Sequence, residues 1–169
     1  MSAAARPSGL VIAVDGPAAS GKGTLAAGLA RHYGLPHLDT GLLYRAVGRA
    51  VRDRAGSPDF ETAAIAAARA LDPSHLSNVE ELQSGEVGQL ASQEAVIGPV
   101  REALRKFQRD FAHQKGGAVL DGRDIGTVIC PDADVKLFIE ADSKARMERR
   151  ARQFEVKGLT VDRYALYHQ

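Results

Sequence analysis

The 169-residue chain predicts an α/β fold in which helices flank a parallel sheet. Short apolar runs, the first at residues 10–14, alternate with stretches of helical periodicity. This alternation is typical of strand–helix–strand units with right-handed crossovers. A glycine-rich loop also joins the first apolar run to the first helix, and the length suits a single domain with a substantial core.

That loop has nine residues, namely Gly16, Pro17, Ala18, Ala19, Ser20, Gly21, Lys22, Gly23 and Thr24. Two glycines five positions apart, followed at once by lysine, allow a tight turn whose N–H groups cradle phosphate oxygens. Lys22 adds a cation for the β- and γ-phosphates, and the following helix would point its N-terminus at the same anion. The pattern predicts a P-loop that binds ATP, with a plain surface turn as the alternative.

One position departs from the usual pattern, which has Ser or Thr directly after the lysine. Here Gly23 follows Lys22, and Thr24 comes next. Thr24 is therefore the candidate hydroxyl near an ATP-bound Mg²⁺. The ending Gly-Lys-Gly-Thr resembles that of nucleoside monophosphate kinases.

Composition argues against several other classes of protein. A net charge of +1 gives no support for a nucleic-acid or membrane surface. Cys130 is the single cysteine, so no disulfide forms within the chain and a cytoplasmic setting is expected. We expect Cys130 to be a small buried residue and not a nucleophile. The five histidines lack metal-ligand spacing and are predicted to be surface or packing residues, and residues 1–9 predict a flexible lead-in.

The first half of the chain predicts two helices around a short strand. The first helix spans residues 24–33, places Leu25, Leu29 and Tyr33 on one stripe and stops at Gly34. A brief strand near residues 37–38 leads into a second helix. That helix is expected to run to about residue 54, with Leu43, Val47 and Val51 on its buried side.

Residues 56–97 are alanine-rich and predict two or three short helices without a strand. Pro99 opens a helix that runs to about residue 115. Its predicted buried residues are Val100, Leu104, Phe107 and Phe111. Strands follow at 118–120 and 135–139, and a strongly basic helix at 143–154.

Four motifs now stand in order along the chain. They are the P-loop, Asp39-Thr40-Gly41 with Tyr44 and Arg45, Ser92 with residues 99–104, and Asp121-Gly122-Arg123-Asp124-Ile125-Gly126-Thr127. From about residue 10 to 161 the chain resembles bacterial cytidylate kinases, which transfer the γ-phosphoryl group of ATP to CMP or dCMP. The resemblance implies a P-loop NTPase-type sheet, Mg²⁺ bound with ATP and a cytoplasmic enzyme that is monomeric at full length. It also implies a kinase domain at 10–169, with an acceptor-binding subdomain at about 56–97 and an incomplete lid at about 150–169.

The resemblance also implies roles for individual residues. Lys22 acts on the ATP side, whereas Arg45 and Arg123 bind the CMP phosphate, which suits bidentate guanidinium groups. The other CMP contacts are Thr40, Ser92, Arg101 and Asp124. The alternatives are a solvated helix charge for Arg45, an ordinary helix serine for Ser92 and a loop carboxylate that caps a turn for Asp124. A carboxylate at Asp124 complements the exocyclic amino group of cytosine and would repel the corresponding carbonyl of uracil. Asp121 ends its strand as a metal-side or water-orienting carboxylate would.

The basic helix carries Arg146, Arg149, Arg150 and Arg152. Arg146 and Arg152 are expected to be solvated. In related kinases this helix leads into a lid that closes over ATP, so Arg149 and Arg150 are candidates for the transferring phosphate. A solvated helix face is the alternative for both.

The chain departs from the family at its end, because Gln169 falls where relatives continue into the rest of the lid, a fifth strand and a final helix. We therefore expect an exposed sheet edge and slow turnover. The competing hypotheses are a kinase for UMP, AMP or shikimate, and a weakly active nucleotide-binding remnant.

Overall fold

The computed structural model describes residues 9–158 and 160. The chain forms two compact units. One contains Val11–His37 and the residues from 119 onward, and the other contains Leu38–Ala118 with residues 9–10. Within the described residues, no helix is both long enough and apolar enough to cross a membrane.

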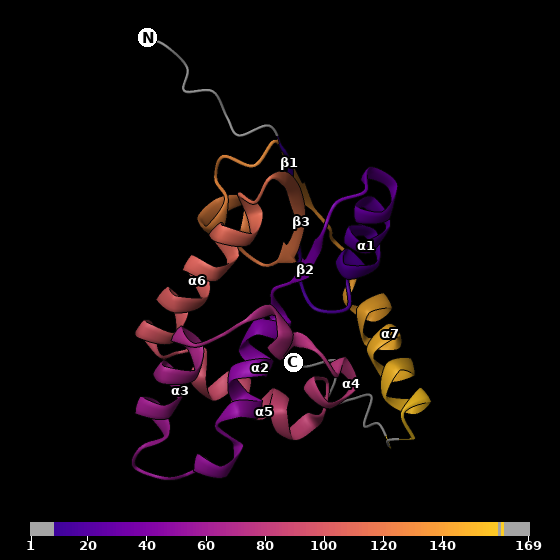
Figure 1. The fold of residues 1–169 in the computed structure, drawn as a ribbon. Helices are drawn as coiled ribbons and strands as arrows, with labels where there is room; N and C mark the ends of the chain where they lie inside the picture. Colours follow the sequence, from indigo (N-terminus) through magenta and orange to yellow (C-terminus); the bar gives the residue numbers. More distant parts are fainter. Residues whose placement is uncertain (1–8, 159, 161–169) are drawn as a thin grey trace. The chain divides into compact units, whose positions relative to one another are not determined.

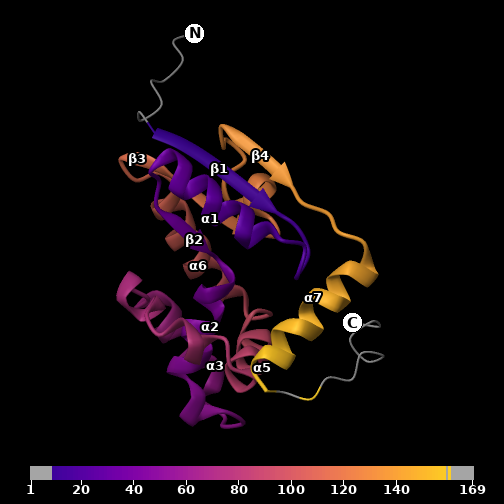
Figure 2. The ribbon, with the colours of Figure 1, turned by 90° about the vertical axis from the view of Figure 1, so that its right-hand side faces the viewer.

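The chain contains a four-stranded sheet, and most of the strand residues belong to the first unit. The strand order is β2 (His37–Asp39), β3 (Gly116–Gly122), β1 (Gly9–Asp15) and β4 (Val135–Phe138). Strands β1 and β4 run parallel and side by side, with Ile12 opposite Val135 (Figure 2). β1 is buried from Val11 onward, as expected for a strand covered on both faces. The predicted four strands are confirmed, although β1 begins at Gly9, inside the predicted lead-in, whose residues 1–8 lie outside the described residues.

Helix α1 (Lys22–Tyr33) begins inside the P-loop, two residues before its predicted start, and ends where predicted. Gly34 adopts φ +64°, and its N–H donates to the carbonyl of Ala30. The predicted buried stripe is wrong, because Leu25 is 38% exposed and Tyr33 is 53% exposed. The helix instead buries two of its three alanines, Ala26 and Ala30, whose small side chains allow close packing but contribute little to a hydrophobic pattern.

The second unit is helical (Figure 1). Its elements are α2 (Gly41–Ala50), η1 (Arg52–Arg54), α3 (Phe60–Arg69), η2 (Pro73–Leu76), α4 (Val79–Leu82), α5 (Gly85–Glu94) and α6 (Gly98–Ala112). α2 packs on α5, and α3 packs on α6. The backbones of α2 and α5 come close together at Gly48, since a Cβ there would lie 3.0 Å from the backbone nitrogen of Ala91. Residues 56–97 contain no strand, as predicted.

Two predicted helices end earlier than expected. α2 stops at Ala50 and continues as the 3₁₀ turn η1, although Leu43, Val47 and Val51 are buried as predicted. α6 ends at Ala112. Its buried residues are Val100, Leu104, Gln108 and Ala112. The predicted Phe107 and Phe111 are only half-buried. The Gln108 amide is accommodated because it donates to the carbonyl of Leu104 at 3.1 Å.

After β3 the chain makes one π-helical turn, η3 (Ile125–Ile129), and Cys130 directly after it is buried as predicted. Helix α7 (Ser143–Val156) confirms the predicted basic helix. Asp142 caps it by accepting hydrogen bonds from the backbone N–H groups of Lys144 and Ala145. Of the predicted lid, residue 159 and residues 161–169 lie outside the described residues. The acceptor-binding role of residues 56–97 stays a prediction.

Helix α5 carries an unusual core residue. Glu94 is fully buried on the same face as Val87, Leu90 and Ala91. Among the described residues, neither of its carboxyl oxygens has a hydrogen-bond partner. Burial raises the pKa of Glu94 to about 9, so the folded protein holds this carboxyl in its neutral form.

We predict that Glu94→Gln stabilises the protein at neutral and alkaline pH. In the unfolded chain the carboxyl has its ordinary pKa of 4.5, so the unfolded state releases the proton above that pH and the folded state retains it up to about 9. Wild-type stability therefore falls as the pH rises from 4.5 to 9. The variant lacks this slope and should be more stable by roughly 3 kcal/mol at pH 7.

Urea unfolding at several pH values measures this difference. Glu61→Gln, at an exposed position of α3, is the matched control and should retain the wild-type slope. Parallel pH profiles for Glu94→Gln and wild type would contradict a neutral, buried carboxyl.

Candidate phosphate-binding site

The P-loop is a strained turn in the first unit, which is called the sheet unit below; the second is called the helical unit. A Cβ at Gly16 would lie only 2.3 Å from the carbonyl oxygen of Ile139, so no larger residue fits there. Gly21 has φ +95° and directly precedes α1. Ala19 has φ +58°, a backbone conformation that is costly for a residue with a side chain and that concentrates at functional sites. The loop thus ends at the positive N-terminus of a 12-residue helix.

Lys22 folds back over this loop, and its Nζ lies 3.4 Å from the carbonyl oxygen of Pro17. The Ser20 hydroxyl is buried inside the loop and has no hydrogen-bond partner among the described residues. Thr24, the predicted hydroxyl for Mg²⁺, is exposed in the first turn of α1. A phosphate group held here would face the loop N–H groups, an ammonium group and the helix terminus.

The structure separates the arginines of α7. Nη1 of Arg149 donates to the carbonyl of Ser20 at 3.1 Å, so this arginine contacts the P-loop. The guanidinium of Arg150 instead lies 5.7 Å from the ring centroid of Phe154 in the same helix. Arg152 is exposed, as predicted.

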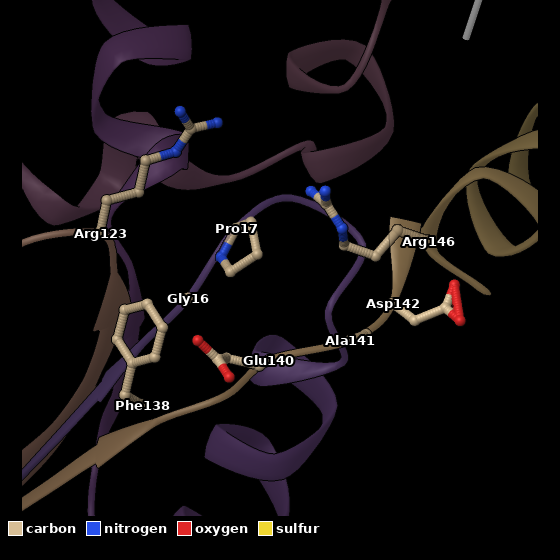
Figure 3. Close-up of a pocket in the computed structure, with 8 residues that line it drawn as sticks. All are labelled: Gly16, Pro17, Arg123, Phe138, Glu140, Ala141, Asp142 and Arg146. Carbon is tan, nitrogen blue, oxygen red and sulfur yellow. The ribbon is translucent and has the colours of Figure 1, made fainter. Parts of the chain in front are cut away.

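An open pocket of about 650 Å³ lies beside the start of the P-loop. It is lined by Gly16, Pro17, Arg123, Phe138, Glu140, Ala141, Asp142 and Arg146 (Figure 3). Figure 3 shows the guanidinium groups of Arg123 and Arg146 on either side of Pro17. The expectation that Arg146 is a solvated residue is therefore wrong, because the first turns of α7 direct it to this pocket. Two guanidinium groups near a P-loop suit a phosphorylated ligand.

Sequence reasoning missed Asp15, the last residue of β1. Its buried carboxylate, 6% exposed, accepts hydrogen bonds from two consecutive backbone N–H groups. Oδ1 lies 2.8 Å from the nitrogen of Ile125, and Oδ2 lies 2.8 Å from that of Gly126. The carboxylate therefore anchors the loop that carries Arg123 and Asp124. The available signal was a charged residue at the end of an apolar strand.

A second carboxylate, Asp121 at the end of β3, is also buried. Its Oδ2 lies 2.6 Å from Nε2 of His37, which corrects the prediction that the histidines are only surface or packing residues. Its Oδ1 lies 4.0 Å from the place that a Cβ on Gly23 would occupy. A carboxylate oxygen thus lies beside the P-loop, at the position where the usual motif has Ser or Thr.

Asp124 directly precedes the π-helical turn, and its backbone carbonyl accepts hydrogen bonds from the N–H groups of Val128 and Ile129. The Asp124 side chain is exposed and makes no capping hydrogen bond. It belongs to the sheet unit, as does Arg123.

The helical unit holds the remaining predicted acceptor residues. Nη1 of Arg45 donates to the carbonyls of Leu82 at 2.8 Å and Ser84 at 3.3 Å. Both Nη atoms would lie 3.2 Å from a Cβ on Gly88, so this glycine leaves room for the guanidinium. The Ser92 hydroxyl donates to the carbonyl of Gly88. Arg45 and Ser92 therefore lie near the same turn of α5.

Two further predicted acceptor residues lie elsewhere in the helical unit. Thr40 is buried directly before α2, and Arg101 is exposed on α6.

The parallel sheet, the glycine loop and the helix that follows it define a P-loop nucleotide-binding protein. Residues 12–169 match the sequence profile of the family described as cytidylate kinase. The chain belongs to the cytidylate kinase family.

Curated relatives agree with this assignment. A cytidylate kinase of Afipia carboxidovorans is 54% identical over 90% of this chain and 73% of its own length. The cytidylate kinase of Xanthobacter autotrophicus is 58% identical over 90% of this chain and 72% of its own length. The cytidylate kinase of Granulibacter bethesdensis is 55% identical over 93% of this chain and 74% of its own length.

We predict that Asp15→Asn destabilises the protein by about 1–3 kcal/mol. An amide can accept one of the two backbone hydrogen bonds, but its NH₂ group then faces the other backbone N–H. Urea unfolding measures the loss. The exposed carboxylate Asp53, changed to Asn in a control, should leave the unfolding midpoint unchanged, and an equally small effect at Asp15 would contradict the anchoring role.

Proposed function

We propose that this chain transfers the γ-phosphoryl group of ATP to CMP or dCMP, with ADP as the second product. The observation that carries this proposal is the P-loop, which contains Lys22 and leads into α1. The chain that carries it belongs to the cytidylate kinase family. Phosphoryl transfer requires two phosphates held in line and a spreading negative charge neutralised. We expect the reaction in the cytoplasm and an enzyme that is monomeric at full length.

On the ATP side, the N–H groups of residues 16–24 and the Lys22 ammonium would hold the β- and γ-phosphates. Arg149 hydrogen-bonds to the carbonyl of Ser20 in the P-loop, and its guanidinium would neutralise the charge that develops on the transferring group. Arg150 stacks on Phe154 instead, which makes Arg149 the stronger candidate of the two.

The residues present fit a Mg²⁺ ion that arrives with ATP. Magnesium takes oxygen ligands and needs only one or two from the protein when phosphates supply others. The carboxylate of Asp121 beside Gly23 and the hydroxyl of Thr24 would hold it. When bound, Mg²⁺ neutralises charge on the β- and γ-phosphates.

On the acceptor side, Arg45 and Arg123 would bind the CMP phosphate. Asp124, Ser92 and Arg101 would read the cytosine edge, where an amino donor lies next to ring acceptors. Thr40 would add a contact at the start of α2. Arg146 joins these candidates, since it lines the same pocket as Arg123.

An ADP-release assay across CMP, dCMP, UMP, AMP and shikimate tests the function. CMP and dCMP should exceed UMP in kcat/KM by about tenfold to a hundredfold, because uracil leaves a polar group of the site unpaired. Equal turnover of UMP and CMP would contradict the roles given to Asp124 and Arg101. Preference for AMP or shikimate would contradict the proposed function itself.

Lys22→Ala should lower kcat at least about a hundredfold, since it removes a preorganised cation from the developing charge. The melting temperature should stay close to that of wild type, because among residues 9–158 and 160 the ammonium makes its one hydrogen bond to the Pro17 carbonyl, at 3.4 Å. Lys115→Ala, at an exposed position after α6, is the matched control and should keep full activity. Near-normal turnover of Lys22→Ala would exclude Lys22 as the catalytic cation.

A further inference from the structure

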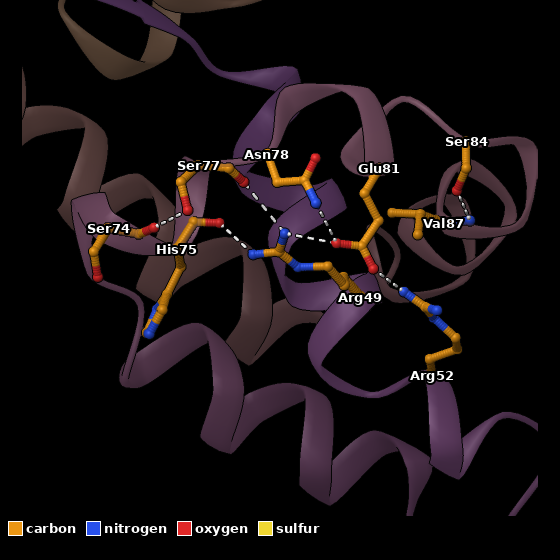
Figure 4. A network of polar contacts seen from close by, with 9 residues as sticks. All are labelled: Arg49, Arg52, Ser74, His75, Ser77, Asn78, Glu81, Ser84 and Val87. Carbon is orange, nitrogen blue, oxygen red and sulfur yellow. Dashed lines mark hydrogen bonds and ion pairs between the residues drawn. The ribbon is translucent and has the colours of Figure 1, made fainter.

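We infer that Glu81 and Arg49 are positioning residues for the acceptor arginine Arg45, through the chain segment that holds its guanidinium. This inference rests on the proposed function, which gives Arg45 the CMP phosphate. All the residues concerned lie in the helical unit, and Figure 4 shows the contacts that Arg49 and Glu81 make there.

Arg49 lies one helical turn after Arg45 on α2 and forms hydrogen bonds to residues 75–81, which precede α5. Its Nη2 donates to the carbonyl of His75 at 2.7 Å, and its Nη1 donates to the carbonyl of Ser77 at 3.2 Å. Nη1 also lies 3.3 Å from Oε2 of Glu81. One guanidinium therefore connects α2 to three points between residues 75 and 81.

Glu81 also accepts hydrogen bonds from Arg52 and Asn78. Its Oε1 accepts a hydrogen bond from Nη2 of Arg52 at 2.6 Å, and its Oε2 accepts one from Nδ2 of Asn78 at 3.1 Å. The hydrogen bond from Arg52 holds the pKa of Glu81 below its ordinary value, so the carboxylate is charged at neutral pH. Two arginines of the α2–η1 region thus meet on a single carboxylate in α4.

The segment that Glu81 and Arg49 fix is the one that holds Arg45. Leu82, directly after Glu81, and Ser84 supply the two carbonyls that accept from Nη1 of Arg45. Both carbonyls restrict the same nitrogen, and Gly88 leaves space beside the guanidinium. A side chain held in advance loses less entropy when it binds a phosphate, which strengthens binding without a new contact.

The sign of the charge separates positioning from simple electrostatics. Removing the negative charge of Glu81 makes the surroundings of Arg45 more positive, which by itself would strengthen binding of a phosphate dianion. Loss of positioning would weaken it. A variant that keeps the shape of Glu81 and removes its charge therefore gives opposite results under the two explanations.

The experiment compares Glu81→Gln with Glu80→Gln, an exposed neighbour in the same helix that loses the same charge. Binding of CMP and of ATP is measured by calorimetry, KM and kcat by the ADP-release assay, and folding by thermal melting. For Glu81→Gln we expect CMP binding about tenfold weaker, with a matching rise in the KM for CMP. ATP binding, kcat and the melting temperature should stay close to wild type, and Glu80→Gln should match wild type throughout.

Arg49→Lys is the second variant, because an ammonium group keeps the charge but lacks the guanidinium fork that reaches two carbonyls and a carboxylate together. It should weaken CMP binding to a similar extent. Unchanged or tighter CMP binding in Glu81→Gln overturns the inference. So does a parallel loss of CMP and ATP binding with a lower melting temperature, or the failure of both variants to fold, since the network would then serve stability alone. If wild type neither binds nor phosphorylates CMP, the proposed function fails and the inference falls with it.

Discussion

The site depends on one buried carboxylate, that of Asp15. It stands at the end of β1, where the strand gives way to the P-loop, and it binds the N–H groups of Ile125 and Gly126. These bonds join the strand that carries the ATP-side loop to the loop that carries Arg123 and Asp124. Hydrogen bonds that two amides donate to a charged carboxylate are among the stronger ones in proteins, and a buried carboxylate without partners would be costly.

Other close contacts hold the two ends of the P-loop. Gly16 lies against the carbonyl of Ile139, directly after β4, and donates its N–H to the carbonyl of Gly122. Arg149 reaches Ser20 from α7. The strained backbone at Ala19 is therefore held between anchored segments, as preorganised phosphate sites require. A phosphate-binding loop held in this way would need little rearrangement on binding, which leaves binding energy for neutralising charge.

Much of this architecture could be predicted from the sequence. The apolar runs predict all four strands, and the glycine pattern predicts the loop and its lysine. The buried face of α1 could not be predicted, because alanines contribute little to a hydrophobic pattern. The links from Asp15 to Ile125, and from His37 to Asp121, span 110 and 84 residues, so no local pattern reveals them. Arg146 and Arg149 look alike in sequence, and only the direction of α7 tells the pocket arginine from the P-loop arginine.

Hydrogen exchange of individual backbone amides, resolved by NMR in the wild-type protein, tests the central claim most directly. If Asp15 anchors the loop, the amides of Ile125 and Gly126 should exchange about a hundredfold or more slowly than the amide of an exposed loop residue such as Gly56. This protection should be present without nucleotide. Exchange of both amides at the rate of Gly56 would show that Asp15 does not hold the loop that carries Arg123 and Asp124 against the P-loop strand. That result would contradict this account of the site.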